Sequence, residues 1–193
     1  MLKNSRGFAH PILLVILSIV VLGTGCFTYT HIKHSQAVNK EKQLYATLDK
    51  QSTDYINAIA AKYPGKIRHE RYCEYGSAKY GKGSLGCRVD VNIGYEDIQD
   101  TQNIIDYAET LKSNIHWRFA YDNTLSNQKY GSPETIKHQV YKEDNLFCSI
   151  EYRNHVIDKR ATLESYVPDK TKLFVSAGCS GNALAEHYPV REH

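Results

Sequence analysis

The sequence lacks a strong excess of charge, and it is poor in phenylalanine, tryptophan and methionine. Its 24 Lys+Arg and 21 Asp+Glu residues give a net charge of only +3. Because nucleic-acid binding requires a concentrated basic surface, this balance argues against a nucleic-acid partner. The aromatic residues are mainly tyrosines, with 15 Tyr against 5 Phe and 1 Trp. A tyrosine combines an apolar ring with a polar tip, so this composition indicates partly wetted sheet surfaces or a binding surface.

The sequence also lacks a recognisable catalytic, metal-binding or cofactor motif, so we expect neither enzyme activity nor a cofactor. Residues 178–181, Gly-Cys-Ser-Gly, do not have the G-x-S-x-G spacing of a nucleophile elbow, and they are better explained as a tight turn after a strand. His31 and His34 are spaced i, i+3. Two ligands are too few for a defined zinc site, and solvated histidines beside a membrane explain them better.

Charged residues are missing from one long N-terminal stretch, between Arg6 and Lys33. Within it, ten of the eleven residues at positions 12–22 are Ile, Leu or Val. Together they favour membrane insertion by about 3 to 6 kcal/mol. Residues 8–30 are long enough to cross a bilayer as a helix. The basic residues Lys3 and Arg6 predict a single-pass protein with residues 1–7 in the cytoplasm and the C-terminal domain outside the cell membrane.

Small residues at Gly23 and Gly25 leave two alternatives to an uncleaved anchor. Cleavage before Cys26 would release the domain, and lipidation of Cys26 would attach it through an acyl chain. Lipoprotein signals have Leu, Val or Ile at the position of Gly23, so we favour the uncleaved anchor. All three alternatives place residues 64–193 outside the cytoplasm.

Besides Cys26, the chain has four cysteines, at Cys73, Cys87, Cys148 and Cys179. An even number in an exported domain indicates two disulfides. Four cysteines allow three pairings, and we favour Cys73–Cys87 and Cys148–Cys179 because each pair flanks predicted neighbouring strands. We expect Cα separations of about 5.5–6 Å within each pair.

The pattern of apolar residues predicts an α+β fold after the transmembrane helix. Residues 31–63 form a juxtamembrane amphipathic helix, with an apolar stripe interrupted at Ser52. Residues 64–193 form a mainly antiparallel, disulfide-stapled sheet with one further helix at residues 101–112. Alternating apolar and polar residues predict strands at 67–75 (an edge strand), 87–95, 115–121, 137–141, 146–153 and 172–179.

The best candidate for partner binding is the predicted mobile loop at residues 76–86, which has four glycines. Tyr75, Lys79, Tyr80 and Lys82 offer rings and hydrogen-bond donors to a protein or an envelope polysaccharide. The glycines give the backbone conformational freedom, and the Cys73–Cys87 bridge would hold the ends of the loop. A solvated hairpin tip remains the simpler interpretation.

Two resemblances rest on these features. The basic start with Gly7 and Phe8, the aliphatic span and the cysteine-stapled tail resemble uncharacterised, N-terminally anchored single-span surface proteins of small-genome bacteria. The Gly7-Phe8 junction, a helix extending to Tyr63 and the pair Cys148–Cys179 are similar to type IV pilins and pseudopilins, which implies a filament subunit. That family has a glutamate five residues into the mature chain, where this sequence has Ile12.

These observations lead to three functional hypotheses. We expect a membrane-anchored extracytoplasmic protein, in contact with the lipid bilayer through residues 8–30, that acts as a binding or envelope-associated module. The alternative is a pilin-like filament or pseudopilin subunit, and the third is a membrane-anchored hydrolase.

Overall fold

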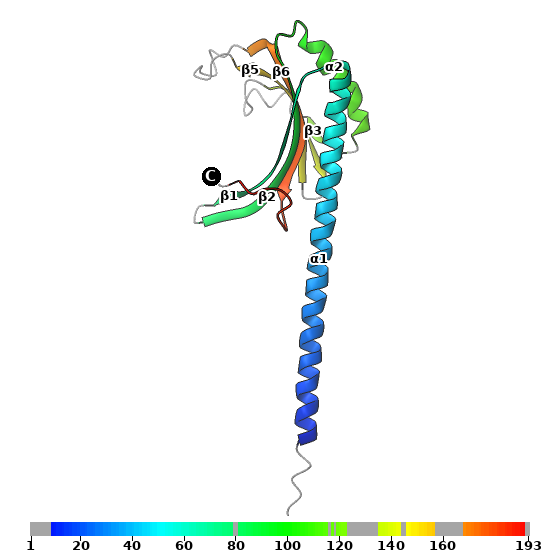
Figure 1. Ribbon diagram of the computed structural model, residues 1–193, viewed down its shortest axis with the longest axis vertical. Helices are drawn as coiled ribbons and strands as arrows, with labels where there is room; N and C mark the ends of the chain where they lie inside the picture. The colour runs from blue at the N-terminus through cyan, green and yellow to red at the C-terminus, as the bar shows by residue number, and fades with distance from the viewer. Residues whose placement is uncertain are drawn as a thin grey trace, which may run out of the picture. The chain divides into compact units, whose positions relative to one another are not determined.

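The computed structural model describes residues 9–78, 81–115, 117, 119–122, 135–143, 146–156 and 168–191, with side chains described from Phe27 onward for most of them. Residues 1–41 and residues 42–193 form two separate compact units. The elements, drawn in Figure 1, are α1 (Ala9–Lys62), β1 (Lys66–Ala78), β2 (Gly81–Tyr95), α2 (Thr101–Leu111), the 3-10 helix η1 (Lys112–Asn114), β3 (Phe119–Asp122), β4 (Thr135–Glu143), β5 (Leu146–Val156) and β6 (Pro168–Asn182). The predicted α+β class is confirmed.

The described strands form one antiparallel sheet in the order β1-β2-β6-β5-β4-β3. β1 lies at an edge, as its polar sequence predicts. The last strand in the chain, β6, lies between β2 and β5, so it joins the β1-β2 hairpin to the other strands. This insertion places residues from three distant parts of the sequence next to one another.

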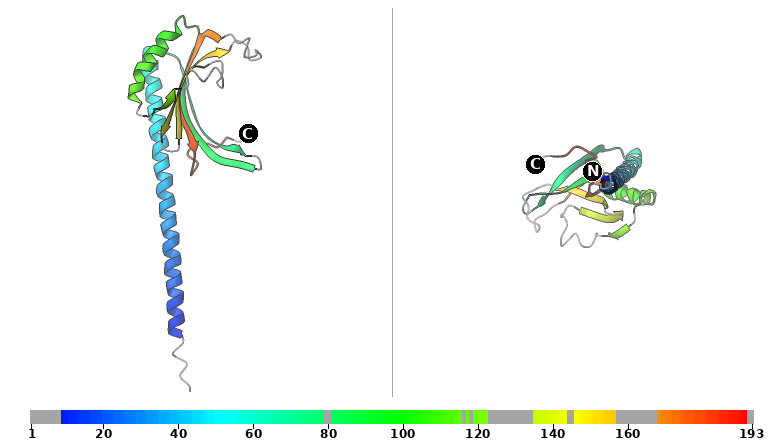
Figure 2. Two further views of the ribbon diagram at one scale, coloured as in Figure 1. Left: turned by 180° about the vertical axis from the view of Figure 1, so that it is seen from behind. Right: turned by 90° about the horizontal axis from the view of Figure 1, so that it is seen from below.

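In the unit of residues 42–193, α1 and α2 lie on the same face of the sheet (Figures 1 and 2). α1 packs on the sheet through Tyr45, Leu48, Ile56 and Ile59, which are buried. Ser52 is a polar residue within this apolar stripe, as predicted. Ser52 is also buried, because its hydroxyl donates a 3.0 Å hydrogen bond to the carbonyl of Leu48 one turn earlier and so leaves no polar group unsatisfied.

The helix-covered face of the sheet has the residues that alternation assigned to the core. The buried apolar residues of the three central strands are Cys87, Val89, Val91, Ile93, Tyr95, Leu146, Cys148, Ile150, Tyr152, Leu173, Val175, Ala177 and Cys179. Alternate residues of these strands therefore point to the opposite face.

Both predicted disulfides, Cys73–Cys87 and Cys148–Cys179, are present. Their Cα separations are 4.0 and 3.9 Å, shorter than the expected 5.5–6 Å. The reason is that each pair is directly opposed in an antiparallel ladder. The backbone N–H and C=O of Cys73 bond to the C-terminal segment instead of to β2, and Cα atoms approach most closely at such non-hydrogen-bonded positions.

The helix predicted at residues 101–112 is confirmed as α2, with Asp100 as the N-cap that accepts hydrogen bonds from two backbone N–H groups. The strand predicted at 115–121 begins later, with β3 at Phe119. Ile115 and Trp117 precede β3 and are buried. Trp117 donates a 2.7 Å hydrogen bond from its indole Nε1 to Gln51 on α1. Trp117 is therefore buried through contact with a helix, and it does not belong to a strand.

The prediction of a mobile loop at residues 76–86 was wrong for the described part of that segment. β1 extends to Ala78 and β2 starts at Gly81, and these two residues are paired. The ladder is made by backbone groups, so glycine-rich sequence can continue it, here with an irregularity between Tyr75 and Ser77. Residues 79 and 80 lie outside the described residues.

Within the part of the chain that the structure describes, no helix is both long and apolar enough to cross a membrane. Most of the predicted span, residues 8–30, lies where side chains are not described, because their description begins at Phe27. The transmembrane helix and the cytoplasmic residues 1–7 therefore stay predictions.

Candidate functional site

The face of the sheet opposite α1 and α2 is polar, and we call it the outer face. It is formed by the residues that alternate with the core positions, including Glu70, Tyr72, Glu74, Gly86, Arg88, Asp90, Asn92, Phe147, Ser149, Glu151, Ser176, Gly178, Ser180 and Asn182. Hydrophilic side chains dominate this set, in contrast to the aliphatic side chains beneath the helices. The outer face is therefore where the sheet can bind a polar ligand.

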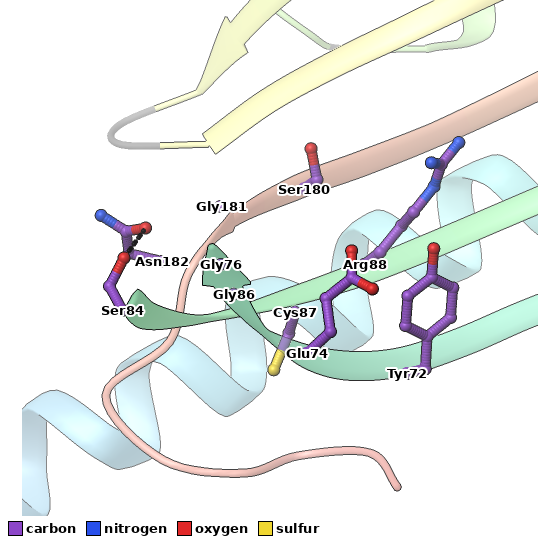
Figure 3. Close-up of a pocket in the computed structure, with 10 residues that line it drawn as sticks. All are labelled: Tyr72, Glu74, Gly76, Ser84, Gly86, Cys87, Arg88, Ser180, Gly181 and Asn182. Carbon is purple, nitrogen blue, oxygen red and sulfur yellow. Dashed lines mark hydrogen bonds between the residues drawn. The ribbon is translucent and has the colours of Figure 1, made fainter. Parts of the chain in front are cut away.

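A pocket of about 310 Å³ lies on the outer face near the end of the β1-β2 hairpin. Figure 3 shows Tyr72, Glu74, Arg88 and Ser180 projecting from one side of the sheet, whereas the sulfur of Cys87 points to the other side. The full lining is Tyr72, Glu74, Gly76, Ser84, Gly86, Cys87, Arg88, Ser180, Gly181 and Asn182. A carboxylate, a guanidinium, hydroxyls and an amide thus converge on one hollow.

The hollow exists because glycine occupies the middle of a cross-strand row. Gly86 lies opposite Glu74 on β1 and opposite Asn182 on β6. A Cβ added at Gly86 would meet the Gly181 carbonyl oxygen at 3.4 Å, so there is room for a small side chain. Because position 86 is a glycine, this space has no side chain of its own, and polar groups surround it.

Arg88 supplies the positive charge of the pocket. Its Nη2 donates a 2.6 Å hydrogen bond to Asp90, whose second carboxylate oxygen accepts one of 2.8 Å from the Ser176 hydroxyl. The side chain of Asp90 is 8% exposed, whereas that of Arg88 is 50% exposed. Burial acts to lower the pKa of Arg88, but the charge and hydrogen bond of Asp90, together with Tyr72 and Glu70, outweigh it and raise the pKa above its ordinary value. Arg88 is therefore a fixed cation with donor groups still facing solvent.

Gly178 makes this arrangement sterically feasible. A Cβ at Gly178 would lie 2.5 Å from the Oδ1 atom of Asp90 and 2.5 Å from the carbonyl oxygen of Val89. The prediction that residues 178–181 form a tight turn was wrong, because they lie within β6. In that strand Cys179 faces the core, and Ser180 faces the pocket.

The C-terminal segment covers the edge of β1 beside the pocket. The backbone N–H of Cys73 donates to the Pro189 carbonyl at 2.9 Å, and the N–H of Arg191 donates to the Cys73 carbonyl at 2.8 Å. The Arg191 guanidinium lies 3.5 Å from the centre of the Tyr72 ring. This segment protects one end of an edge strand and brings a second guanidinium to the site.

Of the four predicted partner-binding residues, Tyr75 is the one whose side chain the structure describes. Tyr75 is 36% exposed and is absent from the described lining. Lys79, Tyr80 and the side chain of Lys82 lie outside the described residues, so their role stays a prediction. The structure does place Gly76, Ser84 and Gly86 of the predicted loop in the pocket wall.

Sequence reasoning missed the role of the polar positions on the predicted strands. Tyr72 and Arg88 are the polar partners in alternating patterns, and they are cross-strand neighbours. The alternation of apolar and polar residues could have indicated that Tyr72 and Arg88 lie on the face opposite the core. The neighbour on the other side, Ser180, comes from β6, and its proximity depends on a strand order that local patterns do not specify.

The described residues contain no group of three or more His, Cys, Asp or Glu side chains that could hold a metal ion. The described pocket lining that contains Ser180 includes no histidine. No protein-family model, curated protein or solved structure matches the chain. The geometry of the outer face is consequently the basis for a functional assignment.

Proposed function

We propose that the protein is a membrane-anchored extracytoplasmic module that binds a cell-envelope component through the outer-face pocket. The observation that carries this proposal is the convergence of Glu74, Arg88 and Ser180 on a hollow kept open by Gly86. Pockets that recognise ligands combine a concave surface with a few convergent polar groups. These groups offer both donors and acceptors, so they suit a polar partner better than a lipid.

Two features of the chain support the anchored, extracytoplasmic part of the proposal. Residues 8–30 lack charged side chains and follow the basic residues Lys3 and Arg6. The disulfides Cys73–Cys87 and Cys148–Cys179 fit an oxidising compartment. The same helix, α1, begins at Ala9 in the apolar segment and later supplies core residues to the sheet domain.

A matched pair of substitutions tests the binding function. Full-length protein, purified in detergent, is incubated with washed envelope material from native cells that lack the protein. Glu74→Gln should reduce retention about tenfold, because it weakens hydrogen bonds that a charged acceptor makes. Glu151→Gln makes the same change on the outer face but away from the pocket, and it should retain envelope material normally. Equal retention of Glu74→Gln and the unmodified protein would contradict the proposal.

A pilin-like subunit is the second candidate, and one observation favours it. α1 runs from Ala9 to Lys62, and its C-terminal part packs on an antiparallel sheet that has a disulfide between β5 and β6. That is the plan implied by the resemblance to pilins and pseudopilins. Mass spectrometry of the mature protein tests it directly, since a pilin-like subunit would be cleaved after Gly7. An intact N-terminus would leave the anchored binding module as the sole proposal.

A further inference from the structure

An exposed aromatic ring lies in the same cross-strand row as the pocket. Phe147 on β5 is directly opposite Ser180 on β6, which is in turn opposite Arg88 on β2. The side chain of Phe147 is 58% exposed, although its neighbours in sequence, Leu146 and Cys148, are buried. The exposed ring of Phe147 is in contact with water, and a ligand that covers it would gain binding free energy by removing apolar surface from water.

The separation of the Phe147 and Arg88 backbones follows from the strand spacing. Adjacent strands are about 4.8 Å apart, so the backbones of Phe147 and Arg88, two strands apart, are separated by roughly 10 Å. Ser180 lies between them. One or two sugar rings can fill such a span, with one ring on the phenylalanine and hydroxyl groups extending towards the pocket.

The charges of the site disfavour a polyanionic ligand. Among the described side chains around the pocket, Arg88 and Arg191 are cations, and Glu70, Glu74 and Asp90 are anions. Because these groups have no excess of positive charge, a phosphate-rich or otherwise polyanionic ligand would gain little attraction over the whole site. The polar lining equally disfavours a purely apolar ligand, since burying its polar groups without hydrogen bonds would be costly.

We propose that the outer face binds a neutral saccharide, which specifies the ligand of the envelope-binding function proposed above and rests on it. The C–H face of a sugar ring would stack on Phe147. Glu74 would accept hydrogen bonds from sugar hydroxyls, Arg88 would donate them, and Ser180 would do either. Saccharides present apolar ring faces and many hydroxyls together, and this combination matches an exposed aromatic ring beside a polar hollow.

Binding to an immobilised panel of neutral and acidic oligosaccharides tests the inference. Full-length protein is used in a zwitterionic detergent, because detergents with sugar head groups would compete for the site. The unmodified protein should bind neutral members of the panel. Phe147→Ala should weaken that binding at least tenfold, whereas Phe147→Trp should preserve it by retaining an aromatic face. Leu184→Ala removes an equally exposed apolar side chain, 58% exposed, from outside the sheet, and binding should be unchanged.

Several outcomes would overturn the saccharide assignment. These are binding to no member of the panel, binding to acidic members only, or equal binding by Phe147→Ala and the unmodified protein. Thermal unfolding of each variant separates lost binding from lost folding. If Glu74→Gln still loses envelope retention while no glycan binds, the saccharide inference fails and the envelope-binding function stands. If retention is unaffected as well, both fail.

Discussion

The hydroxyl oxygens of Tyr55 on α1 and Tyr152 on β5 lie 2.9 Å apart in the core. Tyr55 also makes a hydrogen bond of 3.1 Å to the Ala108 carbonyl of α2. This pair connects both helices to the sheet on the face opposite the pocket. Burial raises the pKa of the Tyr152 hydroxyl well above its ordinary value, and Tyr55 raises it further.

The first prediction concerns alkaline pH. An unfolded tyrosine ionises near pH 10, whereas folded Tyr152 stays neutral to higher pH. Its contribution to stability is therefore complete below about pH 10 and is lost as pH rises further towards the folded pKa. Tyr152→Phe should cost about 0.5–1.5 kcal/mol at neutral pH and should flatten the decline of stability above pH 10. Urea unfolding at a series of alkaline pH values measures this, and an unchanged slope would contradict the assignment.

The second prediction concerns the disulfides, whose partners are 14 and 31 residues apart. On the chain-entropy account, replacing both cysteines by alanine should cost about 3 kcal/mol for Cys73–Cys87 and about 4 kcal/mol for Cys148–Cys179. Denaturant unfolding gives the difference. Non-reducing peptide mapping checks the pairing, and a peptide that links Cys73 to Cys148 would refute the strand order of the sheet.

The third prediction uses two glycines of the outer face. Gly178→Ala should destabilise the fold by about 1–3 kcal/mol, because its Cβ would lie within 2.5 Å of the Asp90 carboxylate and the Val89 carbonyl. Gly86→Ala is the control, since its Cβ would approach the Gly181 oxygen at 3.4 Å and should change stability by less than about 0.5 kcal/mol. Thermal unfolding compares the two, and equal losses would show that the Asp90–Gly178 contact is not tight.

The fourth prediction concerns topology. If Lys3 and Arg6 keep the N-terminus in the cytoplasm, an N-terminal epitope tag should resist protease in intact spheroplasts. The disulfide-bonded domain should be digested or released under the same conditions. A cytoplasmic control protein must stay intact. Protection of the domain under these conditions would mean that it is not outside the membrane.

Local sequence patterns predicted the strands and helices that are determined by residues close together in the sequence. The alternation of Val89, Val91 and Ile93 with polar residues determines which side of β2 is buried, since a strand has a period of two. The capping side chain of Asp100 similarly predicted the start of α2. Both disulfide pairs followed from the predicted neighbouring strands.

The pocket could not be predicted in this way, because it depends on contacts between distant segments. Ser180 lies beside Arg88 only because β6 is inserted between β2 and β5. Asp90 can be buried only because Gly178 leaves room for its carboxylate. Neither relationship produces a periodic signal in one strand. The glycines of residues 76–86 similarly suggested a mobile loop where the structure has a paired hairpin.

The most direct test of the binding role of the outer face is photocrosslinking in cells. A photoreactive phenylalanine analogue at position 147 keeps an aromatic ring next to the pocket, and the same analogue at position 184 serves as the control at an equally exposed site, with 58% exposure for each native side chain. The account predicts a light-dependent adduct with an envelope component at position 147, reduced by Glu74→Gln, and none above background at position 184. Absence of an adduct at position 147, or equal adducts at both positions, would contradict the assignment of the outer face as the binding surface.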